Sequence, residues 1–244
     1  KWGLDWLLKM HPKANEMYNQ IGDDRDHASM RMPKEDPYYG RGFERPVYFI
    51  DGEPQQRGKF MNNTTGTSST AGKFSSAFRL GATLFAKEDR KYARLLSKKS
   101  ASAYAYANIK PGVTQTVSVK SPYIYAEDNW VDDMQLAAAM GFSATKKKKF
   151  AQEGLQYARQ EKVTPWMITD TAAHYQWYPF INLGHYELAK GLKGQDREEI
   201  VSYYKQGIEE VNRRAELNAF YRGVPFIWCS NNLTVSFAIQ CLWY

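Results

Sequence analysis

The feature that most constrains the fold of this chain is a succession of long helical segments from residue 69 onward. Apolar residues recur there at helical spacing, and short connections join consecutive segments, which is typical of helical hairpins. Because the hairpins start near residues 69, 128 and 171, they predict an α/α toroid or solenoid rather than a four-helix bundle. The predicted pairs span 69–86 with 88–109, 127–145 with 148–161, and 170–192 with 196–217, and a last helix spans 230–243.

The first 68 residues follow a different pattern. The stretch "KWGLDWLLKMHP" places Lys1, Asp5 and Lys9 on one polar stripe of a helix whose other positions are almost all apolar, which is typical of a buried helix. No capping residue precedes this helix, so we expect it to start upstream and the chain to be a fragment. Residues 19–68 predict a long loop region with one strand at 46–50, and such a region either lines a site or is poorly ordered.

Composition and charge exclude several classes of protein. With 244 residues and 43% hydrophobic side chains the chain can build a globular core, and its apolar runs are far shorter than the roughly 18 residues that cross a membrane. The net charge of +7 is spread over segments of mixed sign, and the lysine run at 146–149 is expected to be a solvated turn, so neither a nucleic acid nor a membrane is an expected partner. No histidine or cysteine spacing matches a metal or nucleotide site, and Cys229 and Cys241 would lie about 18 Å apart on one helix.

Three clusters combine acids, histidine and aromatic residues, at 23–27, 121–134 and 171–180. Aromatic rings stack on the apolar face of a sugar, while carboxylates and histidine bind its hydroxyl groups, so the clusters indicate a saccharide cleft. Each cluster also has a structural interpretation. Trp177 can be a core residue, His27 can balance charge in a loop, and four acids can stabilise the positive end of a helix: Glu127, Asp128, Asp132 and Asp133.

Several motifs, in the same order along the chain, resemble the glycoside hydrolase family 9 β-glucanases, especially the group found in gut Bacteroidetes. The matching segments are "KWGLDWLLKMHP", "DRDH", "TAGKFSSAFRLGATLFAKEDRKYARLL", "NWVDDMQLAAAMGFSAT" and "PFIWCSNN". The resemblance implies an all-α (α/α)6 barrel whose open cleft binds β-1,4-linked glucans such as cellulose, mixed-linkage glucan or xyloglucan. It implies hydrolysis with inversion, no cofactor, and a secreted, periplasmic or cell-surface location.

The resemblance also implies that residues 1–244 form a fragment of one catalytic domain. The family's paired catalytic Asp residues precede the "KWG" helix and its catalytic Glu follows a later segment, and neither motif is present, so no catalytic residue is assigned in this chain. Apolar faces at both ends of such a fragment would then be uncovered, at Trp2, Trp6, Leu7, Phe237, Leu242 and Trp243.

Substrate-binding residues follow from the same resemblance. His27, with Asp26 in the same D-x-D-H loop, matches the histidine that binds the sugar next to the scissile bond. Trp177, followed by Tyr178, matches a tryptophan that stacks on a glucosyl unit. Tyr123 and Tyr125 match a pair of cleft aromatics. We therefore expect His27, Trp177 and one of these two tyrosines to converge on one cleft.

One departure from the family pattern stands out: Lys73 replaces a glutamate in the helix 69–86, and no role is assigned to it. Two alternatives to a glucanase fragment remain open. The chain could be a sugar-binding or interaction module without chemistry, or a different α/α-toroid enzyme that uses local acids such as Asp26 and Asp128.

Overall fold

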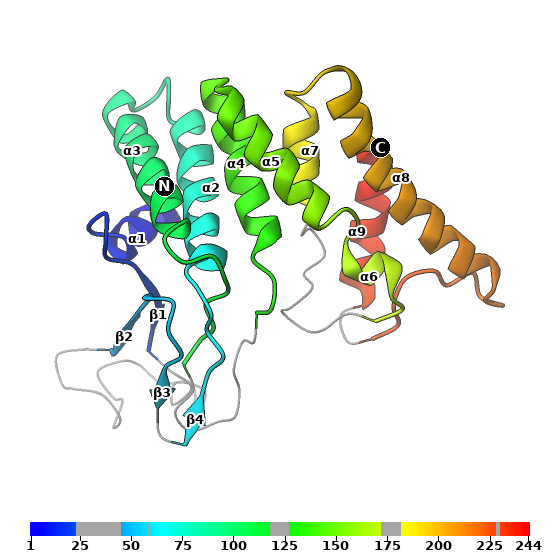
Figure 1. The fold of residues 1–244 in the computed structure, drawn as a ribbon, viewed down its shortest axis with the longest axis horizontal. Coiled ribbons are helices and arrows are strands. Elements are labelled where there is room, and N and C mark those ends of the chain that lie inside the picture. Colours follow the sequence, from blue (N-terminus) through cyan, green and yellow to red (C-terminus); the bar gives the residue numbers. More distant parts are fainter. Residues whose placement is uncertain (23–44, 58, 118–126, 172–181, 228–229) are drawn as a thin grey trace.

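The structure is a computed structural model that describes residues 1–22, 45–57, 59–117, 127–171, 182–227 and 230–244. It consists of paired helices with two small sheets beside the first pair (Figure 1). The three pairs are α2 (Ser68–Leu84) with α3 (Arg90–Ala107), α4 (Val131–Thr145) with α5 (Lys148–Gln160), and α7 (Leu183–Ala189) with α8 (Gly194–Glu216).

The pairs form two layers. Helices α2, α4 and α7 pack side by side in one row, and α3 and α5 pack on α2 and α4 as their hairpin partners. The remaining helices lie at the two ends of the array: α1 (Trp2–Met10) packs on α2, while α6 (Pro165–Ile168) and α9 (Ser230–Trp243) pack on α8. The predicted hairpin order is therefore confirmed for the first two pairs and for α8 and α9.

Small residues bring neighbouring helices close together. A Cβ atom on Gly72 of α2 would lie 3.0–3.1 Å from Asp133 of α4, and one on Gly141 would lie 3.0 Å from the ring of Phe150. Ala138 and Ala139 of α4 are completely buried. Helices whose facing positions are this small can pack at short interaxial distance, which places polar residues on α2 within reach of the start of α4.

The first turn of α2 is fixed by the chain segment that follows α3. The carbonyl oxygen of Gly112 accepts hydrogen bonds from the backbone N–H groups of Ser68 and Ser69, at 3.0 and 3.2 Å. These bonds satisfy N–H groups that a helix start leaves without intrahelical partners. Gly66 and Gly112 pack backbone against backbone here, since a Cβ on Gly66 would lie 2.5 Å from Gly112.

The loop region at 19–68 contains more regular structure than predicted. The strand expected at 46–50 is present as β2 (Val47–Phe49), and it pairs antiparallel with β1 (Tyr18–Ile21). A second pair joins β3 (Gln56–Arg57) and β4 (Phe60–Met61). The sequence did not predict β1, β3 and β4, because strands of two to four residues are too short to show an alternating apolar pattern.

Three further predictions about helices need correction. The first helix is not buried: Trp2 is 86% exposed and Trp6 38% exposed, and only Met10 is buried. The segment 127–145 becomes helical only at Val131, because Asn129 makes a turn in which its side-chain oxygen accepts a hydrogen bond from the Val131 N–H at 3.0 Å. In the described part of 170–192, the helix spans Leu183–Ala189 alone, and the short helix α6 was not predicted.

The exposure predicted for the lysine run is confirmed, and the exposure predicted for the apolar residues at the two ends is confirmed in part. The four lysines at 146–149 are exposed, and Lys146 adopts the left-handed conformation that ends α4. Of the residues expected to be uncovered at the two ends, Leu242 is 85% exposed and Trp2 86%, Trp6 is 38% exposed, and Leu7, Phe237 and Trp243 are half-buried. Among the helices of the described residues, none combines the length and apolarity needed to cross a bilayer.

Candidate functional site

All six predicted substrate-binding residues lie outside the described residues: Asp26, His27, Tyr123, Tyr125, Trp177 and Tyr178. Their convergence on one cleft therefore stays a prediction. The described residues that flank the three segments do show how these segments are anchored to the helix array.

The first two segments share one anchor. Gln20, just before the 23–44 segment, exchanges two hydrogen bonds with the backbone of Val117, its amide donating to the carbonyl at 3.2 Å and its side-chain oxygen accepting from the N–H at 3.0 Å. Val117 directly precedes the 118–126 segment, and Glu127 directly follows it. The Glu127 carbonyl accepts a hydrogen bond from the Gln115 side chain at 3.0 Å. Gln20, which precedes the first segment, and Glu127, which follows the second, are thus both hydrogen-bonded to residues 115–117.

The third segment ends beside α4. Its first described residue, Asn182, precedes α7, and a nitrogen of the His185 ring lies 2.8 Å from the side-chain oxygen of Gln135 in α4. Gly184 permits this contact, because a Cβ there would lie 2.8 Å from the same oxygen. The end of the third segment is therefore fixed next to the helix whose first turn carries the acids of the second cluster.

Those acids form the candidate site that the structure describes directly. Lys73 of α2 binds two of them: its Nζ lies 2.5 Å from Glu127 Oε1 and 2.6 Å from Asp133 Oδ2. The Asp133 side chain is 8% exposed, whereas that of Lys73 is 51% exposed. The lysine therefore reaches inward from the surface to neutralise a buried carboxylate, and Gly72 permits the close approach of α2 to Asp133.

Burial changes the protonation of the two aspartates in the first turn of α4. Desolvation raises the pKa of Asp132 to about 6 although the charge of Lys73 opposes the shift, and Oδ1 of Asp132 is buried with no hydrogen-bond partner among the described residues. Desolvation and the neighbouring Asp132 raise the pKa of Asp133 well above its usual range. Burial lowers the pKa of Lys73, but the attraction of Asp133 and Glu127 outweighs it and the net shift is upward, so the lysine stays charged.

A further carboxyl group, which is half-buried, belongs to the same cluster. Glu161, at the end of α5, accepts a hydrogen bond from the Asn129 side-chain amide at 2.5 Å. Desolvation, and then the charge of Asp132, raises the pKa of Glu161 to about 7. Burial also raises the pKa of Asp128. Asp132 and Glu161 thus gain or lose protons near neutral pH, a property that clusters at functional sites and that ion-pair networks also produce.

Sequence reasoning found only part of this cluster. The acids at 127, 128, 132 and 133 were recognised as a group at a helix start, but Lys73 received no role and Glu161 was not considered. The signal for Lys73 was present, because a cation replaces the glutamate of the family pattern on the face of α2 that meets α4. Nothing in the sequence signals Glu161, since its proximity depends on how α5 packs.

The two described histidines, His11 and His185, are buried and hydrogen-bonded within the fold. His11 is fully buried, its Nδ1 3.0 Å from the Glu16 carbonyl oxygen and its Nε2 2.9 Å from the Ser102 hydroxyl. His185 likewise has a partner at each ring nitrogen, and burial lowers its pKa to about 4. In the described part of the chain no three His, Cys, Asp or Glu side chains are grouped as metal ligands, and the absence of a metal site in the whole chain stays a prediction.

Comparisons with known proteins identify the family. The chain is 30% identical to Endoglucanase 14 of Arabidopsis thaliana over 146 residues, which cover 59% of this chain and 26% of that protein. It is 27% identical to Endoglucanase A of Bacillus pumilus over 173 residues, 70% of this chain and 24% of the relative. The chain thus spans about a quarter of the length of these relatives. The resemblance to the Bacteroidetes group stays a prediction.

Solved structures agree with the fold. A metagenome-derived glycoside hydrolase family 9 endoglucanase superimposes with a TM-score of 0.68 and 20% identity, over 99% of this chain and 40% of that one. The endoglucanase of the termite Nasutitermes takasagoensis gives a TM-score of 0.58 at 19% identity, over 98% and 55% of the two chains. Such endoglucanases are (α/α)6 barrels, so the predicted fold class is confirmed. The sequence profile of glycosyl hydrolase family 9 matches residues 1–244, and the chain belongs to that family.

Proposed function

We propose that the chain is part of the catalytic domain of an inverting endo-β-1,4-glucanase and contributes to its substrate cleft. The observation that carries the proposal is the family match over all 244 residues. The shared anchor of the first two segments supports it, because binding residues on loops with a common base can act on one ligand.

The proposal assigns catalysis and substrate binding to different parts of the domain. Inversion requires a general acid and a general base about 6.5–9.5 Å apart, with room for a water molecule between the base and the sugar. The motifs that supply these carboxylates in the family are not among residues 1–244. His27, Trp177, Tyr123 and Tyr125 would instead hold the glucan, by stacking and by hydrogen bonds to its hydroxyl groups.

The substrate is a β-1,4-linked glucan, and the location is secreted, periplasmic or at the cell surface, where such polymers occur. The names of the relatives support the substrate class. Fractionation of cells that produce the protein tests the location, and recovery in the cytoplasm alone would contradict it.

The test of this function uses the full-length product of the gene that encodes the chain. We expect it to release reducing ends from soluble β-1,4-glucan, and the first product detected by NMR to have the inverted anomeric configuration. Trp177→Ala should weaken glucan binding by at least about tenfold, the size expected from loss of one stacking ring. Phe220→Ala is the matched control, because Phe220 is an aromatic residue that is 91% exposed and belongs to none of the three segments. Equal effects of both substitutions would contradict the proposed binding role.

A second candidate deserves a direct test, because Asp132 and Glu161 titrate near neutral pH. In this alternative the chain is an enzyme that uses local acids such as Asp26 and Asp128. Asp132→Asn and Asp128→Asn in the full-length protein separate the two functions. Under the proposed function both variants keep the chemical step, whereas under the alternative at least one loses it.

A further inference from the structure

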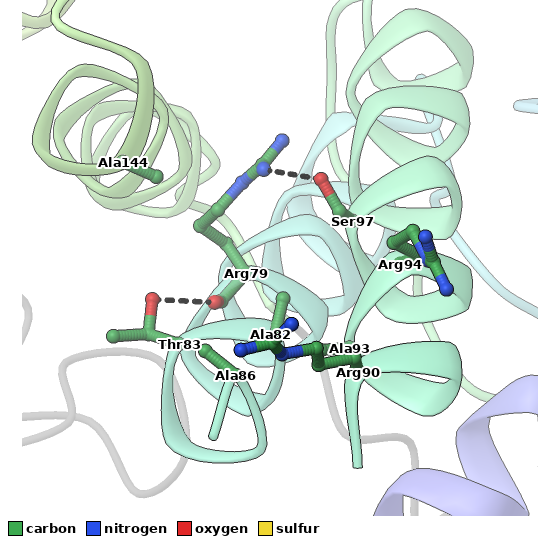
Figure 2. Close-up of a pocket in the computed structure, with 9 residues that line it drawn as sticks. All are labelled: Arg79, Ala82, Thr83, Ala86, Arg90, Ala93, Arg94, Ser97 and Ala144. Carbon is green, nitrogen blue, oxygen red and sulfur yellow. Dashed lines mark hydrogen bonds between the residues drawn. The ribbon is translucent and has the colours of Figure 1, made fainter. Parts of the chain in front are cut away.

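A second polar site lies apart from the acid cluster, between the later part of α2, the first half of α3 and the end of α4. It is a pocket of about 510 Å³ whose lining includes Arg79, Arg90 and Arg94 and no carboxylate (Figure 2). Arg79 lies six residues after Lys73 on the same helix, a displacement of about 9 Å along the axis.

Arg79 is buried without an opposite charge. The residue is 9% exposed, and its Nη1 donates one hydrogen bond, at 2.8 Å, to the hydroxyl of Ser97 on α3. Its Nε is buried and has no hydrogen-bond partner among the described residues, and no described acid forms an ion pair with it. Burial lowers the pKa of the Arg79 guanidinium. A guanidinium that is removed from water in this way is costly unless a negative group faces it.

The surrounding backbone does not supply that charge. The C-terminal ends of α2 and α4 each offer a partial charge of about −0.5, whereas three arginines carry three full positive charges. Arg90 opens α3, so it adds a cation at the positive end of a helix. The nearby Asp89 is already engaged, because its carboxylate caps the Tyr92 N–H at 2.9 Å and lies 3.9 Å from Lys1 Nζ. The pocket therefore keeps a positive excess.

The arginine side chains line the pocket from two helices. Figure 2 shows Arg79 extending from α2 between Ser97 and Ala144, and Arg90 extending from α3 toward Ala82. The guanidinium group binds oxyanions through parallel N–H donors. The Nε of Arg79 is itself buried, so its Nη atoms, of which Nη1 also donates to Ser97, would meet the anion. The volume exceeds that of an inorganic anion, so an organic group that carries the anion also fits.

We propose that this pocket binds a small oxyanion, namely a sulfate, phosphate or carboxylate group, through Arg79 and Arg90. The site does not depend on the proposed glucanase function, because it shares no residue with the acid cluster or the predicted glucan-binding segments. Arg79 fixes the anion from inside the pocket, and Arg90 closes on it from the surface.

The test measures binding to the purified full-length protein. Sodium sulfate, sodium phosphate and sodium glucuronate are compared with sodium chloride at equal ionic strength, by calorimetric titration and by thermal unfolding. We expect at least one oxyanion to raise Tm saturably by about 3 °C or more beyond chloride. Sulfate and phosphate without glucuronate would assign a tetrahedral anion, and glucuronate alone would assign a carboxylate.

Three variants locate the binding. Arg79→Gln retains a donor for Ser97, and Arg90→Gln changes an exposed residue, and each should weaken the anion at least about fivefold. Arg197→Gln, which removes an exposed charge on α8, should bind as the wild type does. If Arg79→Gln does not fold, Arg90→Gln decides alone. No oxyanion effect beyond chloride, or unchanged binding in the folded variants, would overturn the proposal.

Discussion

Replacing Lys73 by glutamine tests the account of the acid cluster at its centre. The substitution removes the cation that binds Glu127 and Asp133 at 2.5 and 2.6 Å, and it leaves the Asp133 carboxylate, 8% exposed, without its counter-charge. Glutamine keeps much of the aliphatic stem, so the change in packing is small.

The size of the effect follows from burial. Breaking a fully buried ion pair costs about 3–5 kcal/mol, and breaking an exposed one costs about 0–1 kcal/mol. Since the Lys73 side chain is 51% exposed, water replaces part of the lost interaction. We therefore expect a loss of about 1–2 kcal/mol in the free energy of unfolding at pH 8.

The loss should shrink as the pH falls. Folding raises the pKa of Asp132 to about 6 and also raises the pKa of Asp133. Around these pKa values the folded state binds protons that the unfolded state does not bind, so the contribution of these groups to stability increases as the pH falls. A protonated carboxyl needs no lysine beside it. At pH 5 the variant should therefore lose less than about half of what it loses at pH 8.

Urea unfolding followed by circular dichroism at pH 5 and pH 8 measures both values. Lys91→Gln is the matched control, because Lys91 is exposed on α3 outside the cluster, and it should change stability by less than about 0.5 kcal/mol at either pH. An equal loss at the two pH values, or no loss at pH 8, would refute the argument that Lys73 neutralises buried carboxylates.

Three other predictions follow from single sites. Gly66→Ala should destabilise the protein by about 2 kcal/mol or more in urea unfolding, because the new Cβ would lie 2.4 Å from the carbonyl oxygen of Lys110. Burial lowers the pKa of His185 to about 4 from the usual value near 6.5. The stability that the neutral His185 contributes is therefore fully present above pH 6.5, and about 3 kcal/mol of it is lost as the pH falls from 6.5 to 4. His185→Gln should remove that part of the pH dependence, and an unchanged slope would contradict it. His27→Ala in the full-length protein should raise KM for soluble β-glucan, and an unchanged KM would contradict the binding role assigned to this residue.

The sequence was sufficient to predict the first two helical hairpins, because apolar spacing and small residues such as Ala138 and Gly141 determine which faces meet. It could not predict the exposure of Trp2 and Trp6, since periodicity reports which side of a helix is apolar and not what covers it. The strand pairs were also beyond it, because Tyr18–Ile21 and Val47–Phe49 are brought together from distant parts of the chain.

The polar clusters show the same limit more sharply. Acids at 127–133 were visible as a group, yet their raised pKa values depend on burial against α2 and α5, which no local pattern encodes. Arg79 is a charged residue whose neighbours in its helix are apolar and small, and the packing of α2, α3 and α4 is needed to show that it is buried without a described acid beside it.

Glucan hydrolysis by residues 1–244 alone, compared with the full-length gene product, shows whether this chain carries the chemistry or only part of the cleft. Light scattering first verifies that a monodisperse fraction is assayed, because exposed Trp2 and Leu242 favour self-association. The account predicts that the full-length protein releases reducing ends from soluble β-glucan and xyloglucan, while the 244-residue chain binds at most weakly and releases none above a blank. Sustained release by the chain alone, abolished by Asp26→Asn or Asp128→Asn, would contradict it and assign the chemistry to local acids.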